Sequence, residues 1–132
     1  MKKIMIVDDS LMVRLNLKRL FEKHGYEVVA EACDGRDAVD KFEKFQPDLI
    51  TMDITMPIMD GISALREIMK IDGDARVIMI SALGQESKII EAVNSGAKHY
   101  IQKPINDLHA IKIIEGVMNS DEEELLNVCI AR

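Results

Sequence analysis

Five short apolar runs alternate with five segments of helical periodicity, and this alternation constrains the fold more than any other feature. The apolar runs are 4–7, 27–32, 49–52, 77–80 and 100–102. The helical segments between and after them are 11–24, 37–45, 63–71, 86–95 and 107–118. Strands that alternate with helices through short connections predict a parallel sheet with helices on both of its faces.

Three of the apolar runs, 4–7, 49–52 and 77–80, contain no polar alternation. Continuous apolar strands are typical of sheets that are buried on both faces, whereas a sheet with one wet face alternates. We therefore predict an α/β, doubly wound fold with a five-stranded parallel sheet. Ser10 is well placed to cap the first helix, because its side chain can accept a hydrogen bond from the first helical turn.

Composition excludes several classes of protein. The chain has 132 residues and a formal net charge of −6, so we expect one domain that phosphate backbones repel and that does not bind nucleic acid. Two cysteines, Cys33 and Cys129, make no disulfide framework. No apolar run approaches the ~18 residues of a membrane span, and Asp8 and Asp9 cut short the apolar start that imitates a signal peptide. We predict a cytoplasmic protein with no membrane partner.

Polar side chains follow four of the five apolar runs directly. Asp8 and Asp9 follow the first run, Asp53 the third, Ser81 the fourth and Lys103 the fifth. The carboxyl ends of parallel strands meet at one edge of a sheet, which is where such folds bind their ligands. We therefore expect these five side chains to converge on one site.

The chemistry of this set points to phosphoryl transfer. Three neighbouring carboxylates repel one another, and a hard divalent cation such as Mg²⁺, or alternatively Mn²⁺, removes that penalty. A carboxylate can attack phosphorus and form an acyl phosphate. The metal, the Lys103 ammonium and the Ser81 hydroxyl would then share the three phosphoryl oxygens.

Four motifs occur in order at these predicted strand ends. They are Ile6-Val7-Asp8-Asp9, the segment 52–61 that reads MDITMPIMDG, Ser81-Ala82 and Lys103-Pro104. With them the chain resembles the receiver domains of two-component signalling, and most of all the free-standing receivers of chemotaxis. The resemblance covers residues 1–118 and implies the flavodoxin-like (βα)5 topology.

The resemblance also implies a role for individual residues. Asp53 matches the aspartate that accepts a phosphoryl group from a histidine kinase. Asp8 and Asp9 match the acidic pair that holds Mg²⁺, and Asp53 itself completes the metal site. Thr55 matches the position whose backbone carbonyl is a further metal ligand.

Three more positions match the switch of the family. Ser81 matches the switch hydroxyl, and Lys103 matches the lysine that pairs with the phosphoryl group. Tyr100 matches an aromatic side chain that moves inward on activation. The face expected to change on phosphorylation then consists of residues 86–95, Tyr100 and residues 107–118.

The predicted function is that of a phospho-accepting response regulator that switches a partner-binding face. Its expected partners are a histidine kinase, an output protein such as a flagellar motor component, and a phosphatase. It would not be an enzyme beyond its own phosphorylation and dephosphorylation. The alternative is a receiver domain cut from a longer response regulator with a DNA-binding or enzymatic output domain.

Residues 119–132 extend beyond the resemblance. The stretch Ser120-Asp121-Glu122-Glu123 fits a capping box, and apolar residues follow it at 125, 126, 128 and 130. These residues predict either a short amphipathic helix or a frayed acidic tail.

Overall fold

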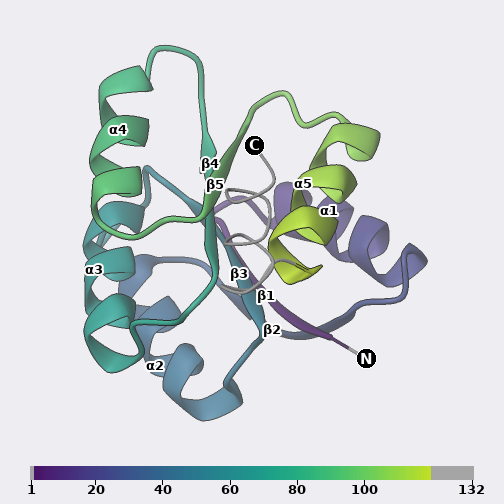
Figure 1. Cartoon of the computed structure of the whole chain (residues 1–132), viewed down its shortest axis with the longest axis horizontal. Coiled ribbons are helices and arrows are strands. Elements are labelled where there is room, and N and C mark those ends of the chain that lie inside the picture. Colours follow the sequence, from purple (N-terminus) through teal and green to yellow (C-terminus); the bar gives the residue numbers. More distant parts are fainter. Residues whose placement is uncertain (1, 120–132) are drawn as a thin grey trace, which may run out of the picture.

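A parallel five-stranded sheet forms the centre of the computed structural model, which describes residues 2–119 (Figure 1). The strands are β1 (Lys3–Val7), β2 (Glu27–Ala32), β3 (Leu49–Asp53), β4 (Val77–Ser81) and β5 (His99–Gln102). Their order across the sheet is β2-β1-β3-β4-β5, and every neighbouring pair is parallel. The predicted five-stranded parallel sheet is confirmed.

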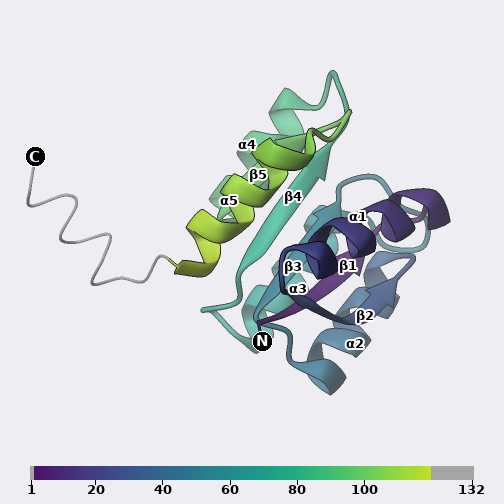
Figure 2. The ribbon, with the colours of Figure 1, turned by 90° about the vertical axis from the view of Figure 1, so that its right-hand side faces the viewer.

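Helices cover both faces of this sheet. They are α1 (Leu11–Lys23), α2 (Gly35–Phe45), α3 (Gly61–Ile71), α4 (Glu86–Asn94) and α5 (Asp107–Asn119). Figure 1 shows α2, α3 and α4 on one side of the sheet and α1 and α5 on the other, and Figure 2 shows α1 and α5 from their own side. This is the doubly wound arrangement that the alternation of strands and helices predicts.

Two apolar layers result from the alternation of side chains along each strand. In β1, Met5 and Val7 pack in the layer under α2, α3 and α4, whereas Ile4 and Ile6 pack in the layer under α1 and α5. All four side chains are fully buried. The continuous apolar runs are therefore explained by burial on both faces, as predicted.

Two helices begin earlier than the sequence pattern predicts. Helix α2 begins at Gly35 and α3 at Gly61, each two residues before the predicted start. The side chains of Asp34 and Asp60 cap them, and each accepts a hydrogen bond of 2.8 Å from the backbone N–H of the third helical residue. A glycine next to an acidic residue resembles a turn in sequence, although here it is the first residue of a capped helix. The predicted cap of α1, Ser10, is confirmed at 3.3 Å.

The predicted tail lies outside the described residues, except for Asn119, which is the last residue of α5. Its two alternatives, a short helix or an acidic tail, and the domain boundary at residue 118 therefore stay predictions. In the part of the chain that the structure describes, none of the helices has the length and the apolar character that crossing a membrane requires.

Ile58 adopts a backbone conformation that its side chain disfavours. Its φ is 69° and its side chain is 84% exposed. The left-handed region costs a β-branched residue roughly 1–2 kcal/mol, and little burial offsets this cost. We expect Ile58→Gly to raise the free energy of unfolding by about 1 kcal/mol in urea titrations. Ile58→Val should give no such gain, because it keeps the branched side chain, and equal effects of the two variants would contradict this explanation.

Candidate functional site

The carboxyl edge of the sheet carries the acidic residues that the sequence singles out. Asp53 is the last residue of β3, and Asp8 follows β1, the neighbouring strand. Both are buried, with Asp8 fully enclosed and Asp53 only 7% exposed, whereas Asp9 is exposed. Carboxylate oxygens of these three residues lie within 4.8 Å of one another. The predicted convergence of Asp8, Asp9 and Asp53 is therefore observed.

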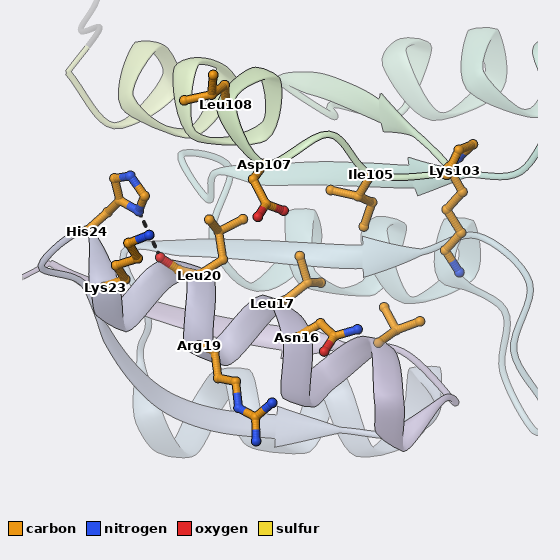
Figure 3. Close-up of a pocket in the computed structure, with 12 residues that line it drawn as sticks. Asn16, Leu17, Arg19, Leu20, Lys23, His24, Lys103, Ile105, Asp107 and Leu108 are labelled. Carbon is orange, nitrogen blue, oxygen red and sulfur yellow. Dashed lines mark hydrogen bonds between the residues drawn. The ribbon is translucent and has the colours of Figure 1, made fainter.

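Lys103 brings one positive charge to this cluster from beyond β5. Its Nζ lies 3.2 Å from Oδ2 of Asp8 and 3.6 Å from Oδ1 of Asp53. The same side chain lines one end of a groove of about 820 Å³ between α1 and the segment that leads into α5 (Figure 3). Lys103 is thus in direct contact with two of the three carboxylates, 95 residues away from Asp8 in sequence.

Asp8 is held in place by neighbours that the sequence does not reveal. Its Oδ1 accepts a hydrogen bond of 2.8 Å from the backbone N–H of Ser10, and its own N–H donates to the carbonyl of Ala32 at 3.1 Å. Arg14 Nη1 donates to the Asp8 carbonyl at 2.7 Å, while Arg14 Nε pairs with Glu31 at 3.1 Å. In sequence Arg14 resembles an ordinary surface residue of a helix, so only the fold shows its role.

The charges at this edge do not balance. Three carboxylates and one ammonium leave an excess of two negative charges. Burial, with the carboxylates of Asp8 and Asp9, raises the pKa of Asp53 to about 6, although the Lys103 ammonium acts in the opposite direction. Burial lowers the pKa of Lys103, but Asp53 and Asp8 outweigh burial and hold its pKa above the ordinary value. Carboxylate oxygens with two excess negative charges are a fitting donor set for one divalent cation.

The raised pKa of Asp53 predicts a pH-dependent cost to stability. The folded chain binds this proton more tightly than the unfolded chain, so stability falls as pH rises from about 4 to about 6, and the full cost is present above pH 6. In EDTA, Asp53→Asn should therefore unfold with a free energy on the order of 2–3 kcal/mol larger than wild type at pH 7.5. At pH 4 the two should be nearly equal. Urea titrations at both values test this, and a difference independent of pH would contradict it.

Three other predicted residues lie around this cluster in different ways. Ser81 ends β4 next to β3 and is fully buried, and its Oγ has no hydrogen-bond partner among residues 2–119. Thr55 is exposed, and its Oγ1 accepts a hydrogen bond of 2.8 Å from Gln85, a residue that the sequence did not single out. Tyr100 is 41% exposed and lies beside the His99 ring, so it does not point inward here.

Comparison with known proteins decides the family. The model of the response regulator receiver domain matches residues 4–115. The chain belongs to this receiver family. The chemotaxis protein CheY of Bacillus subtilis is 50% identical over 117 residues, which are 89% of this chain and 98% of that protein. CheY of Thermotoga maritima is 47% identical over 116 residues, which are 88% of this chain and 97% of the relative.

A solved structure agrees with these sequence relatives. In the complex of CheX, CheY, BeF3 and Mg²⁺ from Borrelia burgdorferi, the similar chain has a TM-score of 0.86 and 39% identity, with 90% of each chain covered. The flavodoxin-like fold and the function of a phospho-accepting response regulator of the chemotaxis type are thereby confirmed. Such a receiver domain is not a conventional enzyme, and its acidic cluster is a possible metal site.

Proposed function

We propose that Asp53 is the residue of this receiver domain that accepts the phosphoryl group, with a histidine kinase as the donor. The observation that carries this assignment is the position of Asp53, which is nearly buried at the end of β3 among two more carboxylates and the Lys103 ammonium. A buried carboxylate with uncompensated negative neighbours binds a cation, and with that cation it can receive an anionic group.

The residues proposed to hold the cation are Asp8, Asp9, Asp53 and the backbone carbonyl of Thr55. Mg²⁺ is the proposed ion and Mn²⁺ the alternative, because all donors are hard oxygens. When bound, it would neutralise the carboxylates and the phosphoryl oxygens, whose charges otherwise repel. The ion pair between Lys103 and Asp8 and the contact of Arg14 with the Asp8 carbonyl hold Asp8, one of these ligands, in place.

The proposed transfer forms one bond and breaks one. An Asp53 carboxylate oxygen forms a bond to phosphorus while the phosphorus–nitrogen bond of a phosphohistidine breaks. The imidazole leaves with the electron pair and takes up a proton from water. Lys103, 3.6 Å from Asp53 Oδ1, pairs with the added negative charge. Later attack by water on phosphorus regenerates the Asp53 carboxylate and releases inorganic phosphate, so the domain catalyses only its own phosphorylation and dephosphorylation.

The proposed output surface consists of α4, Tyr100 and α5. Ser81 ends β4 and Tyr100 lies in the adjacent strand β5, so a shift of Ser81 toward a phosphoryl oxygen reaches this face directly. Exposed apolar side chains of α4, Ile90 and Val93, are available there for a partner. We propose an output protein such as a flagellar motor component, and a phosphatase as a further partner.

The chemotaxis-type function is supported by two relatives named CheY, of which the match covers 97% and 98%. The alternative, a receiver domain cut from a longer response regulator, is not better supported by these relatives. The cytoplasmic location and the absence of nucleic-acid partners stay predictions from composition.

A small phosphodonor tests this function without knowledge of the kinase. With phosphoramidate and Mg²⁺, the intact mass of the full chain should rise by one phosphoryl group. The group should be lost on treatment with hydroxylamine, which cleaves acyl phosphates, and EDTA should prevent its addition. A chain that stays unmodified under these conditions, or a modification that resists hydroxylamine, would refute the proposal.

Loss of one acidic ligand should separate metal binding from folding. Asp9→Asn should weaken Mg²⁺ binding by more than about tenfold, since loss of even an indirect partner of a metal ligand costs that much. The rise of the melting temperature with added Mg²⁺ measures binding. Asp40→Asn, which removes an exposed carboxylate on α2, should keep the wild-type rise. An undiminished rise in Asp9→Asn would remove this residue from the proposed ligands.

A further inference from the structure

The side chain of Gln85 connects the two loops that follow Asp53 and Ser81. Its Nε2 donates a hydrogen bond of 2.8 Å to Thr55 Oγ1, two residues after Asp53. Its Oε1 accepts a hydrogen bond of 2.7 Å from the backbone N–H of Ala82, the residue after Ser81. One amide group therefore joins the β3–α3 loop to the β4–α4 loop at the carboxyl edge of the sheet.

This amide does not serve the helix on which it lies. Gln85 occupies the N-cap position of α4, but its side chain makes no capping hydrogen bond. Helices α1, α2 and α3 have side-chain caps from Ser10, Asp34 and Asp60. Glutamine is not among the preferred N-cap residues, because they have shorter side chains that reach the first turn. The length of Gln85 instead allows it to span the gap between the two loops.

The bridge restrains the residue next to Ser81. The Ser81 hydroxyl is buried and has no hydrogen-bond partner within residues 2–119, so in this arrangement it donates to nothing. The proposed shift of Ser81 toward a phosphoryl oxygen on Asp53 would also move Ala82, the next residue of the chain and the start of the β4–α4 loop. While Gln85 connects Ala82 to Thr55, that movement must either move both loops or break the bridge.

We propose that Gln85 is a positioning residue that holds the site in its resting arrangement and thereby slows acceptance of the phosphoryl group. The inference rests on the proposed role of Asp53. Only the fraction of molecules already in the competent arrangement accepts the group, so the observed rate is reduced by that fraction. In this proposal the two hydrogen bonds of the bridge are broken in the competent arrangement, so they lower that fraction. In water the net free energy of such hydrogen bonds is small, because water competes for the same donors and acceptors. This net free energy corresponds to a change in rate of about three- to tenfold.

A double-mutant cycle on the full chain tests the bridge. Phosphorylation by phosphoramidate is followed by intact mass at saturating Mg²⁺ in wild type, Gln85→Ala, Thr55→Val and the double variant. Thr55→Val removes the hydroxyl that accepts the hydrogen bond and keeps the backbone carbonyl. Gln85→Ala should be phosphorylated about three- to tenfold faster, Thr55→Val should also be faster, and the double variant should not exceed Gln85→Ala.

Two measurements separate a positioning role from general loosening of the loop. Ser87→Ala removes an exposed side chain from the first turn of α4 and should keep the wild-type rate. Exchange of the Ala82 amide hydrogen with solvent should be slower in wild type than in Gln85→Ala, because the bridge protects it. Equal exchange in the two proteins would show that the bridge does not form in solution, which overturns the inference.

The kinetic outcomes are equally decisive. An unchanged or slower rate in Gln85→Ala, or single effects that multiply in the double variant, would overturn the role of Gln85. If wild type is phosphorylated at Asp53 and Gln85→Ala behaves identically, this inference alone fails. If Asp53→Asn is labelled as fully as wild type, it is the proposed function that fails.

Discussion

Asp53→Asn is expected to abolish phosphoryl acceptance from small donors and from kinases. The variant replaces the carboxylate oxygen proposed to attack phosphorus with an amide, which is a far weaker nucleophile. It also removes one of three carboxylates whose oxygens lie within 4.8 Å of one another. We expect a complete loss, because neither of the other two carboxylates can replace Asp53 as the acceptor. Asp8 is fully buried and paired with Lys103, and Asp9 is not at the end of β3, where Asp53 lies.

Loss of phosphorylation in this variant cannot be attributed to unfolding. Burial and the neighbouring carboxylates raise the pKa of Asp53 to about 6, so its ionised form costs stability at neutral pH. The asparagine variant is therefore expected to be the more stable protein there. Intact mass after phosphoramidate treatment measures the loss, and urea titration of the same sample measures the stability. Asp40→Asn serves as the matched control and should be labelled like wild type. If Asp53→Asn is labelled to the same extent as wild type, another residue is the acceptor.

Gly61→Ala is expected to have the largest effect on stability. A Cβ atom at Gly61 would lie 2.0 Å from the backbone carbonyl oxygen of Asp53, far inside contact distance. The obstacle is backbone at the end of a buried strand, so no side-chain rotation can relieve it. The Gly61 N–H also donates to the Ile54 carbonyl at 2.8 Å, and this hydrogen bond would be strained by any shift. We expect the free energy of unfolding to fall by about 3 kcal/mol or more.

Gly73→Ala is the matched control for this variant. A Cβ atom at Gly73 would meet nothing within 4 Å, so its free energy of unfolding should stay within about 0.5 kcal/mol of wild type. Gly61 lies against the backbone of Asp53, so a shift caused by the added Cβ atom would also displace this proposed metal ligand. The molecules of Gly61→Ala that remain folded should therefore bind Mg²⁺ more weakly. If Gly61→Ala is as stable as wild type, the β3–α3 loop can move at little cost in free energy. That result would contradict the proposed steric conflict between residue 61 and the Asp53 backbone.

The site contains groups that cost stability and whose cost a ligand would offset. Asp53 is ionised at neutral pH although its environment favours the proton, and the Ser81 hydroxyl is buried with no partner among the described residues. Buried polar groups are normally hydrogen-bonded, so the Ser81 hydroxyl is an exception, as is the buried Thr51 hydroxyl within β3. A cation among the carboxylates and a phosphoryl oxygen near the Ser81 hydroxyl would remove both costs.

The sequence alone determined the element order and the residues of the acidic cluster. Hydrophobic periodicity is local, so the five strands and five helices could be predicted within about two residues at their ends. The parallel topology follows from the alternation, and it implies that Asp8, Asp53, Ser81 and Lys103 end their strands at one edge. The prediction needed only the position of each polar residue after an apolar run.

Only the tertiary structure decided the contacts between these elements. The order β2-β1-β3-β4-β5 brings β1 and β3 together, and the loop after β5 reaches across so that Lys103 meets both Asp8 and Asp53. The contact of Arg14 with the Asp8 carbonyl, and the bridge from Gln85 to Thr55, have no sequence signal. Both join residues from different elements, and their partners are set by the packing of helices and loops around the sheet, which no local pattern encodes.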